Sequence, residues 1–139
     1  MSVKRVQATV VAFGNDAVFI RGAAGSGKSG LALEMMALGA KLVGDDGVDL
    51  QARDGVIVAR PVPATAGLIE ARYLGILKVP YAGAAHVRYI VDMDAASEKR
   101  LPELQIETLM GVEVPVIYGK NTPNLPAALL ALLSGGLVT

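Results

Sequence analysis

Short runs of apolar and often β-branched residues alternate with glycine-containing turns along most of the chain. The first run covers residues 6–13 and ends at Gly14-Asn15-Asp16, and the second covers residues 17–20. Both runs are typical of strands closed by turns. The same pattern predicts further strands at residues 41–43, 48–50, 56–58, 87–91 and 112–116.

Helical spacing marks two segments. Leu31, Met35 and Leu38 recur at helical intervals, and Gly39 follows where a left-handed C-cap is expected. Residues 125–133 are rich in leucine and alanine but contain Pro126 and fall short of the roughly 20 apolar residues of a membrane-spanning helix. We expect this segment to be a terminal helix packed on the core, in an α/β protein with more strand than helix.

The amino-acid composition excludes several kinds of binding partner and several kinds of metal site. The chain has 139 residues without a repeat or a break in composition, which predicts a single domain over residues 1–139. Thirteen basic residues balance thirteen acidic ones, so nucleic acid is not an expected partner, and without a long apolar segment neither is a membrane. Without cysteine, and with His86 as the one histidine, any metal must bind oxygen ligands. We interpret His86 as structural or exposed and the four tyrosines as packing residues.

The N-terminal residues contain lysine and arginine but no continuous apolar stretch that ends in a cleavage site. A signal peptide is therefore not predicted, and a cytoplasmic location is the expectation.

A glycine-rich loop lies between the second predicted strand and the first predicted helix. It reads Gly22-Ala23-Ala24-Gly25-Ser26-Gly27-Lys28-Ser29, which is the complete P-loop pattern. Glycines allow the backbone N–H groups to point inward, and the following helix adds its positive N-terminal dipole. Lys28 would then reach the β- and γ-phosphates while Ser29 coordinates Mg²⁺. The sequence therefore predicts ATP and Mg²⁺ binding, against the alternative of a nucleotide-shaped but inactive loop.

Two adjacent carboxylates follow the apolar run at residues 41–43. They are Asp45 and Asp46, in the turn Gly44-Asp45-Asp46-Gly47. One carboxylate could hold the metal or its waters while the other accepts a proton from an attacking hydroxyl. A polar turn between strands would use the same residue types, but the position at the mouth of an apolar strand favours a functional role.

The P-loop, residues 40–46 and the segment Leu68-Ile69-Glu70-Ala71-Arg72-Tyr73-Leu74-Gly75-Ile76 together resemble the catalytic domain of HPr kinase/phosphorylase. The resemblance covers nearly the whole chain and is to the short form that lacks the N-terminal domain of the longer enzymes. It implies an ATP-dependent serine kinase acting on an HPr-like phosphocarrier of the sugar phosphotransferase system, often with phosphorolysis of the same phosphate. It also implies a P-loop domain with a mixed sheet similar to that of phosphoenolpyruvate carboxykinase, and a homo-hexamer.

The resemblance assigns roles residue by residue. Lys28 is similar to the P-loop lysine of the family, Ser29 to its magnesium-binding serine and Asp46, beside Asp45, to its acid/base. Glu70 is similar to the glutamate that completes the magnesium site. Arg100 matches, less securely, a catalytic arginine that would stabilise charge on the transferring phosphoryl group, and an exposed charge is the alternative interpretation.

Several positions depart from the family pattern. Gln7 stands where a histidine is usual, Gly30 replaces an acidic residue and Gly47 replaces an arginine. In the segment similar to a loop tied to dephosphorylation, Pro115 to Asn121, two arginines are absent, at Ile117 and Lys120, and lysine cannot bind phosphate in the bidentate way of arginine.

Three hypotheses follow. The first is an active kinase with weak phosphorylase activity, and the second is a nucleotide-binding regulatory module that has lost phosphotransfer. A kinase for a small metabolite is the third, but it would usually need a lid, which the sequence does not show.

Overall fold

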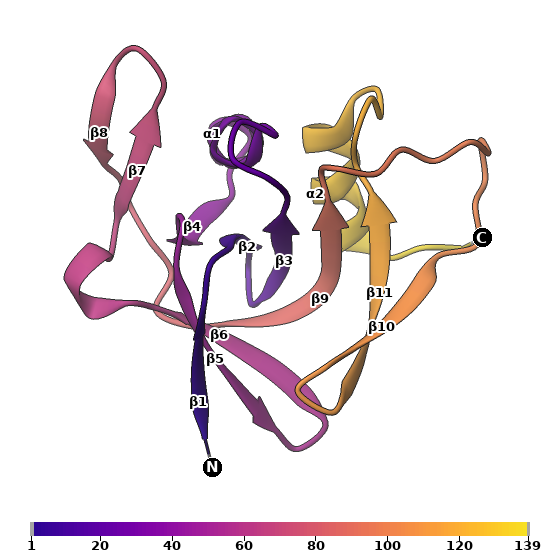
Figure 1. Ribbon diagram of the computed structural model, residues 1–139, viewed down its shortest axis with the longest axis horizontal. Coiled ribbons are helices and arrows are strands. Elements are labelled where there is room, and N and C mark those ends of the chain that lie inside the picture. The colour runs from indigo at the N-terminus through magenta and orange to yellow at the C-terminus, as the bar shows by residue number, and fades with distance from the viewer. Residues whose placement is uncertain (1, 139) are drawn as a thin grey trace.

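The computed structural model describes residues 2–138, in which two α-helices cover one face of a large mixed β-sheet (Figure 1). This arrangement confirms the predicted α/β class with more strand than helix. The elements in chain order are β1 (Val3–Val6), β2 (Thr9–Phe13), β3 (Asp16–Arg21), α1 (Lys28–Ala37), β4 (Lys41–Gly44), β5 (Val48–Arg53), β6 (Val56–Pro61), the 3₁₀ turn η1 (Pro63–Thr65), β7 (Leu68–Ala71), β8 (Gly75–Lys78), β9 (Ala85–Asp92), β10 (Gln105–Leu109), β11 (Val112–Tyr118) and α2 (Leu125–Gly135).

The main sheet has the strand order β1-β5-β6-β9-β3-β2-β4, and β11 with its partner β10 joins it beside β9. The pairs β3–β9 and β9–β11 are parallel, whereas the other pairs are antiparallel. The predicted mixed sheet is therefore confirmed. Since β3 and β9 run in parallel, the segments that follow them meet at the same edge of the sheet.

Successive side chains of the strands point to opposite faces of the sheet and pack into two separate apolar clusters. On β3, Ala17 and Phe19 belong to one cluster, whereas Val18 and Ile20 belong to the other. The first cluster fills the space between the centre of the sheet and the curled strands β5, β6 and β11. The second lies beneath α1 and α2, where Met35 and Leu129 are almost completely buried. Burial on both faces explains why the central strands read as continuous apolar runs.

Helix α1 ends as the sequence predicts. Gly39 has a φ of 109°, its N–H donates to the Met36 carbonyl oxygen at 3.1 Å, and the Ala40 N–H donates to the Met35 carbonyl oxygen at 3.1 Å. These bonds form the Schellman cap that glycine permits. The chain is thereby reversed into β4, which carries the two aspartates back to the helix N-terminus. Within residues 2–138, no helix is long and apolar enough to cross a membrane.

Three sequence predictions need correction, and two elements were missed. The single strand predicted at residues 6–13 is two strands that break at Gln7, because β1 pairs with β5 whereas β2 pairs with β3 and β4. The strand predicted at residues 112–116 continues to Tyr118 as β11, so the segment from Pro115 to Tyr118, which the resemblance placed in a loop, forms ladder pairs with β9 and β10. Tyr73 is not a packing residue, because it is fully exposed at the turn of the β7–β8 hairpin. The hairpin itself and β10 were not predicted.

Candidate functional site

The glycine-rich loop connects β3 to α1, which confirms the predicted strand-loop-helix setting. Gly22, Gly25 and Gly27 have φ values of 154°, 83° and 99°, a region that side chains disfavour. The Ser26 N–H donates to the Ala23 carbonyl oxygen at 3.0 Å and closes the loop. No acidic side chain occupies the first turn of α1, so its free N–H groups remain available to an anion.

Lys28 lies across this loop. Its Nζ donates to the carbonyl oxygens of Gly22 at 2.8 Å and of Ala23 at 3.2 Å. Both acceptors belong to the loop itself, so the ammonium is held at the place where a phosphate group would be bound. The buried Ser26 hydroxyl has no hydrogen-bond partner within residues 2–138, which is costly for a loop shaped only for its own stability. These observations fit a loop that is completed by a phosphate ligand.

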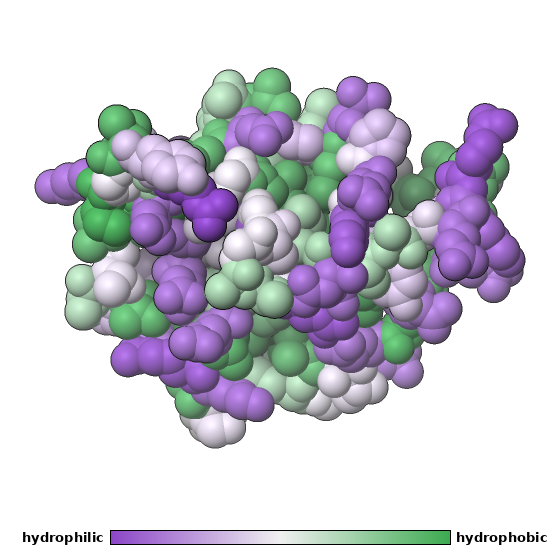
Figure 2. Space-filling model, turned by 45° about the horizontal axis from the view of Figure 1, so that its top comes forward, coloured by the Kyte–Doolittle hydropathy of each residue, from purple (hydrophilic) through white to green (hydrophobic). Residues whose placement is uncertain are grey.

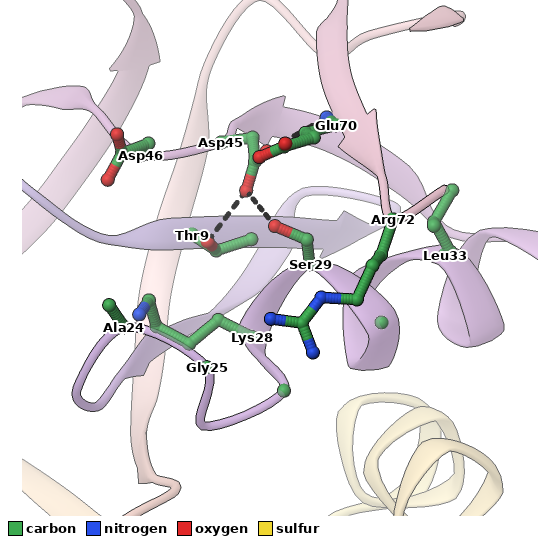
Figure 3. Close-up of a pocket in the computed structure, with 12 residues that line it drawn as sticks. Thr9, Ala24, Gly25, Lys28, Ser29, Leu33, Asp45, Asp46, Glu70 and Arg72 are labelled. Atoms are coloured by element: carbon green, nitrogen blue, oxygen red, sulfur yellow. Dashed lines mark hydrogen bonds between the residues drawn. The ribbon is translucent and has the colours of Figure 1, made fainter. Parts of the chain in front are cut away.

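Asp45 connects three elements of the site. Its Oδ1 accepts hydrogen bonds from the Ser29 hydroxyl at 2.8 Å and from the Thr9 hydroxyl at 3.0 Å, and its Oδ2 accepts the Glu70 backbone N–H at 3.2 Å (Figure 3). Ser29 lies in the first turn of α1, Thr9 belongs to β2 and Glu70 to β7. The carboxylate therefore holds the helix N-terminus, the sheet and the hairpin together.

Asp46 has a different environment from its neighbour. Its carboxylate is exposed and lies on the side of the pocket away from Glu70 (Figure 3). Its φ of 60° is left-handed, a conformation that aspartate tolerates better than most residues. A side chain at Gly44 would collide with the Gly47 carbonyl, so the turn depends on that glycine. The two carboxylates thus differ in position and in bonding, as their proposed division of roles requires.

The β7–β8 hairpin supplies the remaining wall. Buried Ile69 anchors it to the apolar cluster beneath α1, whereas Glu70 and Arg72 line the pocket. The Arg72 side chain points from the hairpin toward the phosphate-binding loop (Figure 3). No role was predicted for Arg72 from the sequence, although Arg72 lies within the segment 68–76 that carries the resemblance.

The phosphate-binding loop, the aspartate turn and the hairpin form the walls of an open pocket. Its volume is about 450 Å³, within the usual range for small-molecule sites. The pocket is lined by Thr9, Ala24, Gly25, Gly27, Lys28, Ser29, Gly30, Leu33, Asp45, Asp46, Glu70 and Arg72. Most of the predicted site residues therefore meet in one place.

Arg100 does not line this pocket. It lies in the irregular segment after β9, where it borders a separate depression together with Lys120 and Tyr118. Ile117 packs against the cluster beneath the helices, and Gln7 is exposed between β1 and β2. The catalytic role of Arg100 stays a prediction.

His86 lies on β9, 4.0 Å from an oxygen of Asp16. Burial lowers the pKa of the imidazole below its ordinary value, and Arg88 lowers it further, while Asp16 opposes both effects. The neutral form is favoured, which agrees with a structural residue outside the pocket.

The donor set fits a magnesium ion bound together with phosphate. Among residues 2–138, no three histidine, aspartate or glutamate side chains gather into a metal site. Ser29 and Glu70 would supply one hydroxyl and one carboxylate oxygen, and Mg²⁺ commonly completes such a set with phosphate oxygens and water.

Fold and site together define a P-loop domain with a mixed sheet. Residues 2–129 match the family model described as the HPr Serine kinase C-terminal domain. The chain belongs to this family, which confirms the resemblance seen in the sequence.

Curated relatives share part of the chain. This chain is 39% identical over 75 residues to the HPr kinase/phosphorylase of Clostridium beijerinckii, a match that covers 54% of this chain and 25% of the relative. The HPr kinase/phosphorylase of Clostridium acetobutylicum is 41% identical over 63 residues, a match that covers 45% of this chain and 21% of that relative. The matched region thus spans about a quarter or less of these relatives.

A solved structure supports the fold over a longer stretch. The Hpr(Ser) kinase/phosphatase from Coxiella burnetii matches with a TM-score of 0.81 and 23% identity, covering 94% of this chain and 94% of that chain. At this level of identity the likeness establishes the fold alone.

Proposed function

We propose that the chain is a Mg²⁺- and ATP-dependent kinase that phosphorylates a serine of an HPr-like phosphocarrier. The observation that carries the proposal is the hydrogen bond between Ser29 and Asp45 beside a complete P-loop. It joins the predicted metal-binding hydroxyl to the predicted carboxylate pair at the N-terminus of α1. Membership of the HPr serine kinase family supports the choice of substrate.

Nucleotide binding is assigned to residues 22–29. The loop N–H groups and the α1 dipole would hold the phosphates, and Lys28 would exchange the Gly22 and Ala23 carbonyl oxygens for phosphate oxygens. The exchange replaces two neutral acceptors with charged ones, which strengthens the hydrogen bonds of the ammonium.

Metal binding is assigned to Ser29 and Glu70, with Asp45 as the orienting group. A hydroxyl has one proton and two lone pairs. Because Ser29 directs its proton to Asp45, its lone pairs face elsewhere and remain available for coordination. Mg²⁺, when bound, neutralises charge on the β- and γ-phosphates.

Proton transfer is assigned to Asp46. Its exposed carboxylate lines the pocket and can be reached by a hydroxyl carried on another protein. The attacking serine would lose its proton to this carboxylate as the bond to phosphorus forms. Arg72, and not Arg100, is the arginine that the pocket offers for the charge on the transferring group.

A protein substrate suits the surroundings better than a small metabolite does. The pocket is open, and the adjacent hairpin exposes Tyr73 fully, Leu74 by 75% and Ile76 by 65%. Figure 2 shows hydrophobic residues gathered at the upper left, where the hairpin lies. Exposed apolar patches commonly mark protein contacts. We further propose that residues 1–139 act as one catalytic domain and assemble as the homo-hexamer that the family resemblance implies.

The alternative is a regulatory module that binds nucleotide without transferring phosphate. Gly30, which lines the pocket, and Gly47, in the turn beside Asp46, stand where the family pattern has charged residues, and Arg100 lies outside the pocket. This arrangement keeps the phosphate-binding loop but reduces the charge available for the reaction.

An assay with labelled ATP, Mg²⁺ and candidate HPr-like carriers separates the two functions. The kinase predicts label on one carrier serine, none on a carrier with that serine changed to alanine, and little with the Asp46→Asn protein. Nucleotide binding without transfer to any carrier would favour the regulatory module.

A further inference from the structure

The segment that follows β9 packs against the start of the phosphate-binding loop. The Met93 N–H donates to the Arg21 carbonyl oxygen at 2.9 Å, and a side chain at Gly22 would contact Met93. Because β3 and β9 are parallel neighbours, both segments leave the sheet at the same edge. Residues 92–94 therefore border the loop without belonging to it.

Asp94 makes a direct contact with the loop backbone. Its Oδ2 and Oδ1 lie 2.9 Å and 3.1 Å from the Ala23 nitrogen, which donates its N–H to the carboxylate. Asp94 is itself held in place, since its own N–H donates to Asp92 Oδ1 at 2.9 Å. The other Asp92 oxygen pairs with Arg21 at 3.3 Å. The backbone of Asp94 is thus tied through Asp92 to Arg21 at the end of β3, which places its carboxylate beside the loop.

The peptide group between Gly22 and Ala23 lies between Asp94 and Lys28. It is trans, so its N–H and C=O point in opposite directions. Asp94 accepts the N–H, and the Gly22 carbonyl oxygen on the opposite side accepts from Lys28 Nζ at 2.8 Å. A negative charge at one end and a positive charge at the other polarise the same peptide, which strengthens both hydrogen bonds.

Local backbone preference does not fix this peptide plane. Gly22 has a φ of 154°, and glycine can adopt either sign of φ at little cost. Rotation of the plane would turn the Gly22 carbonyl away from Lys28. An acceptor outside the loop that binds the Ala23 N–H therefore restrains the plane and keeps the carbonyl turned toward Lys28.

We propose that Asp94 is a positioning residue that sets the location of Lys28 through the Gly22–Ala23 peptide. It holds the ammonium across the loop and so reduces the reordering needed when phosphate binds. The effect on nucleotide affinity rests on the proposed function, whereas the effect on Lys28 itself does not.

The test compares the wild-type chain with Asp94→Ala, Asp94→Asn and, as a control, Glu98→Ala, whose exposed carboxylate lies in the same irregular segment. Each protein, free of nucleotide, is treated with a trace of an amine-acylating reagent, and modification of Lys28 is measured relative to exposed Lys4 by mass spectrometry. Since Asp94 is exposed, the substitutions should preserve the fold, which the thermal unfolding midpoint checks.

Asp94→Ala should raise the modification rate of Lys28 about two- to tenfold, the range for loss of one hydrogen bond, and should speed amide hydrogen exchange at Ala23. Asp94→Asn keeps an acceptor oxygen and should give a smaller rise, and Glu98→Ala should give none. Unchanged Lys28 modification in Asp94→Ala, or an equal rise in Glu98→Ala, would overturn the proposal.

A double-mutant cycle adds the nucleotide. Asp94→Ala should weaken Mg²⁺-ATP binding about two- to tenfold when Lys28 is present and should have no further effect in Lys28→Met. An equal loss in both backgrounds would contradict action through Lys28. A wild-type chain that binds no nucleotide would instead defeat the proposed function, and the acylation result would still decide the role of Asp94.

Discussion

The hydroxyl of Ser29 donates a 2.8 Å hydrogen bond to Oδ1 of Asp45, and the same oxygen accepts the hydroxyl of fully buried Thr9. One carboxylate oxygen thus serves a residue of the phosphate-binding helix and a residue of the sheet core. Asp45 therefore has a structural role as well as its proposed place beside the metal, and its variants need a stability measurement next to any activity measurement.

Asp45→Ala should lower the free energy of unfolding by about 1–3 kcal/mol, because the buried Thr9 hydroxyl is left without an acceptor. Denaturant unfolding measures the change. Asp46→Asn is the matched control, since its carboxylate is exposed and asparagine tolerates the left-handed φ, so its effect should stay within about 0.5 kcal/mol. Equal losses in the two variants would show that Asp45 does not hold the site together.

Asp46→Asn should keep Mg²⁺-ATP affinity while losing roughly 10²- to 10⁴-fold in phosphoryl transfer, the usual range for a general base. The amide has the shape of the carboxylate but cannot accept the serine proton. Single-turnover assays with a carrier measure the loss. Near-normal turnover in this variant would exclude Asp46 as the base.

Arg72→Ala should reduce phosphoryl transfer by about 10²-fold or more, because Arg72 lines the pocket and would stabilise charge on the transferring group. Arg100→Ala, with its side chain in a separate depression, should reduce it less. Steady-state kinetics of the two variants under the same conditions make the comparison. A larger loss in Arg100→Ala would return the catalytic role to Arg100.

Phosphorolysis should be weak relative to phosphorylation. The reverse reaction must hold inorganic phosphate beside a phosphoserine, yet the pocket sets three carboxylates, Asp45, Asp46 and Glu70, against the cations Lys28 and Arg72. The carboxylates repel a second anion, and Lys120, which stands where the resemblance expects an arginine, lies in the separate depression beside Arg100 and adds no charge to the pocket. The test is to measure how fast inorganic phosphate releases label from a phosphorylated carrier. A release rate equal to the rate of phosphorylation would contradict the prediction.

The sequence was most informative where one residue type is chemically required. The P-loop glycines, Lys28 and Ser29 could be located because each has a distinct task at a fixed spacing, and Gly39 because the helix needs a left-handed residue at its end. The apolar runs located the central strands, since burial on both faces leaves only apolar positions.

Residues whose placement depends on distant parts of the fold could not be located in this way. The hairpin that carries Glu70 and Arg72 is short, exposes most of its side chains and is anchored by Ile69. Its local pattern therefore lacks the apolar run that predicts a strand. Strand β10 was missed for the same reason, because its side chains are largely exposed. The choice between Arg72 and Arg100 depends on which segment folds over the loop, which neither spacing nor composition reveals.

The central claim is that residues 22–29 form a working nucleotide site, and titration calorimetry with Mg²⁺-ATP tests it most directly. The wild-type chain should bind Mg²⁺-ATP, and Lys28→Ala should bind it much more weakly while unfolding at a similar temperature, because the proposed role of the ammonium is to hold the phosphates and its hydrogen bonds are to the loop rather than to the core. Absence of measurable binding by the folded wild-type chain, or equal affinity in Lys28→Ala, would contradict the account.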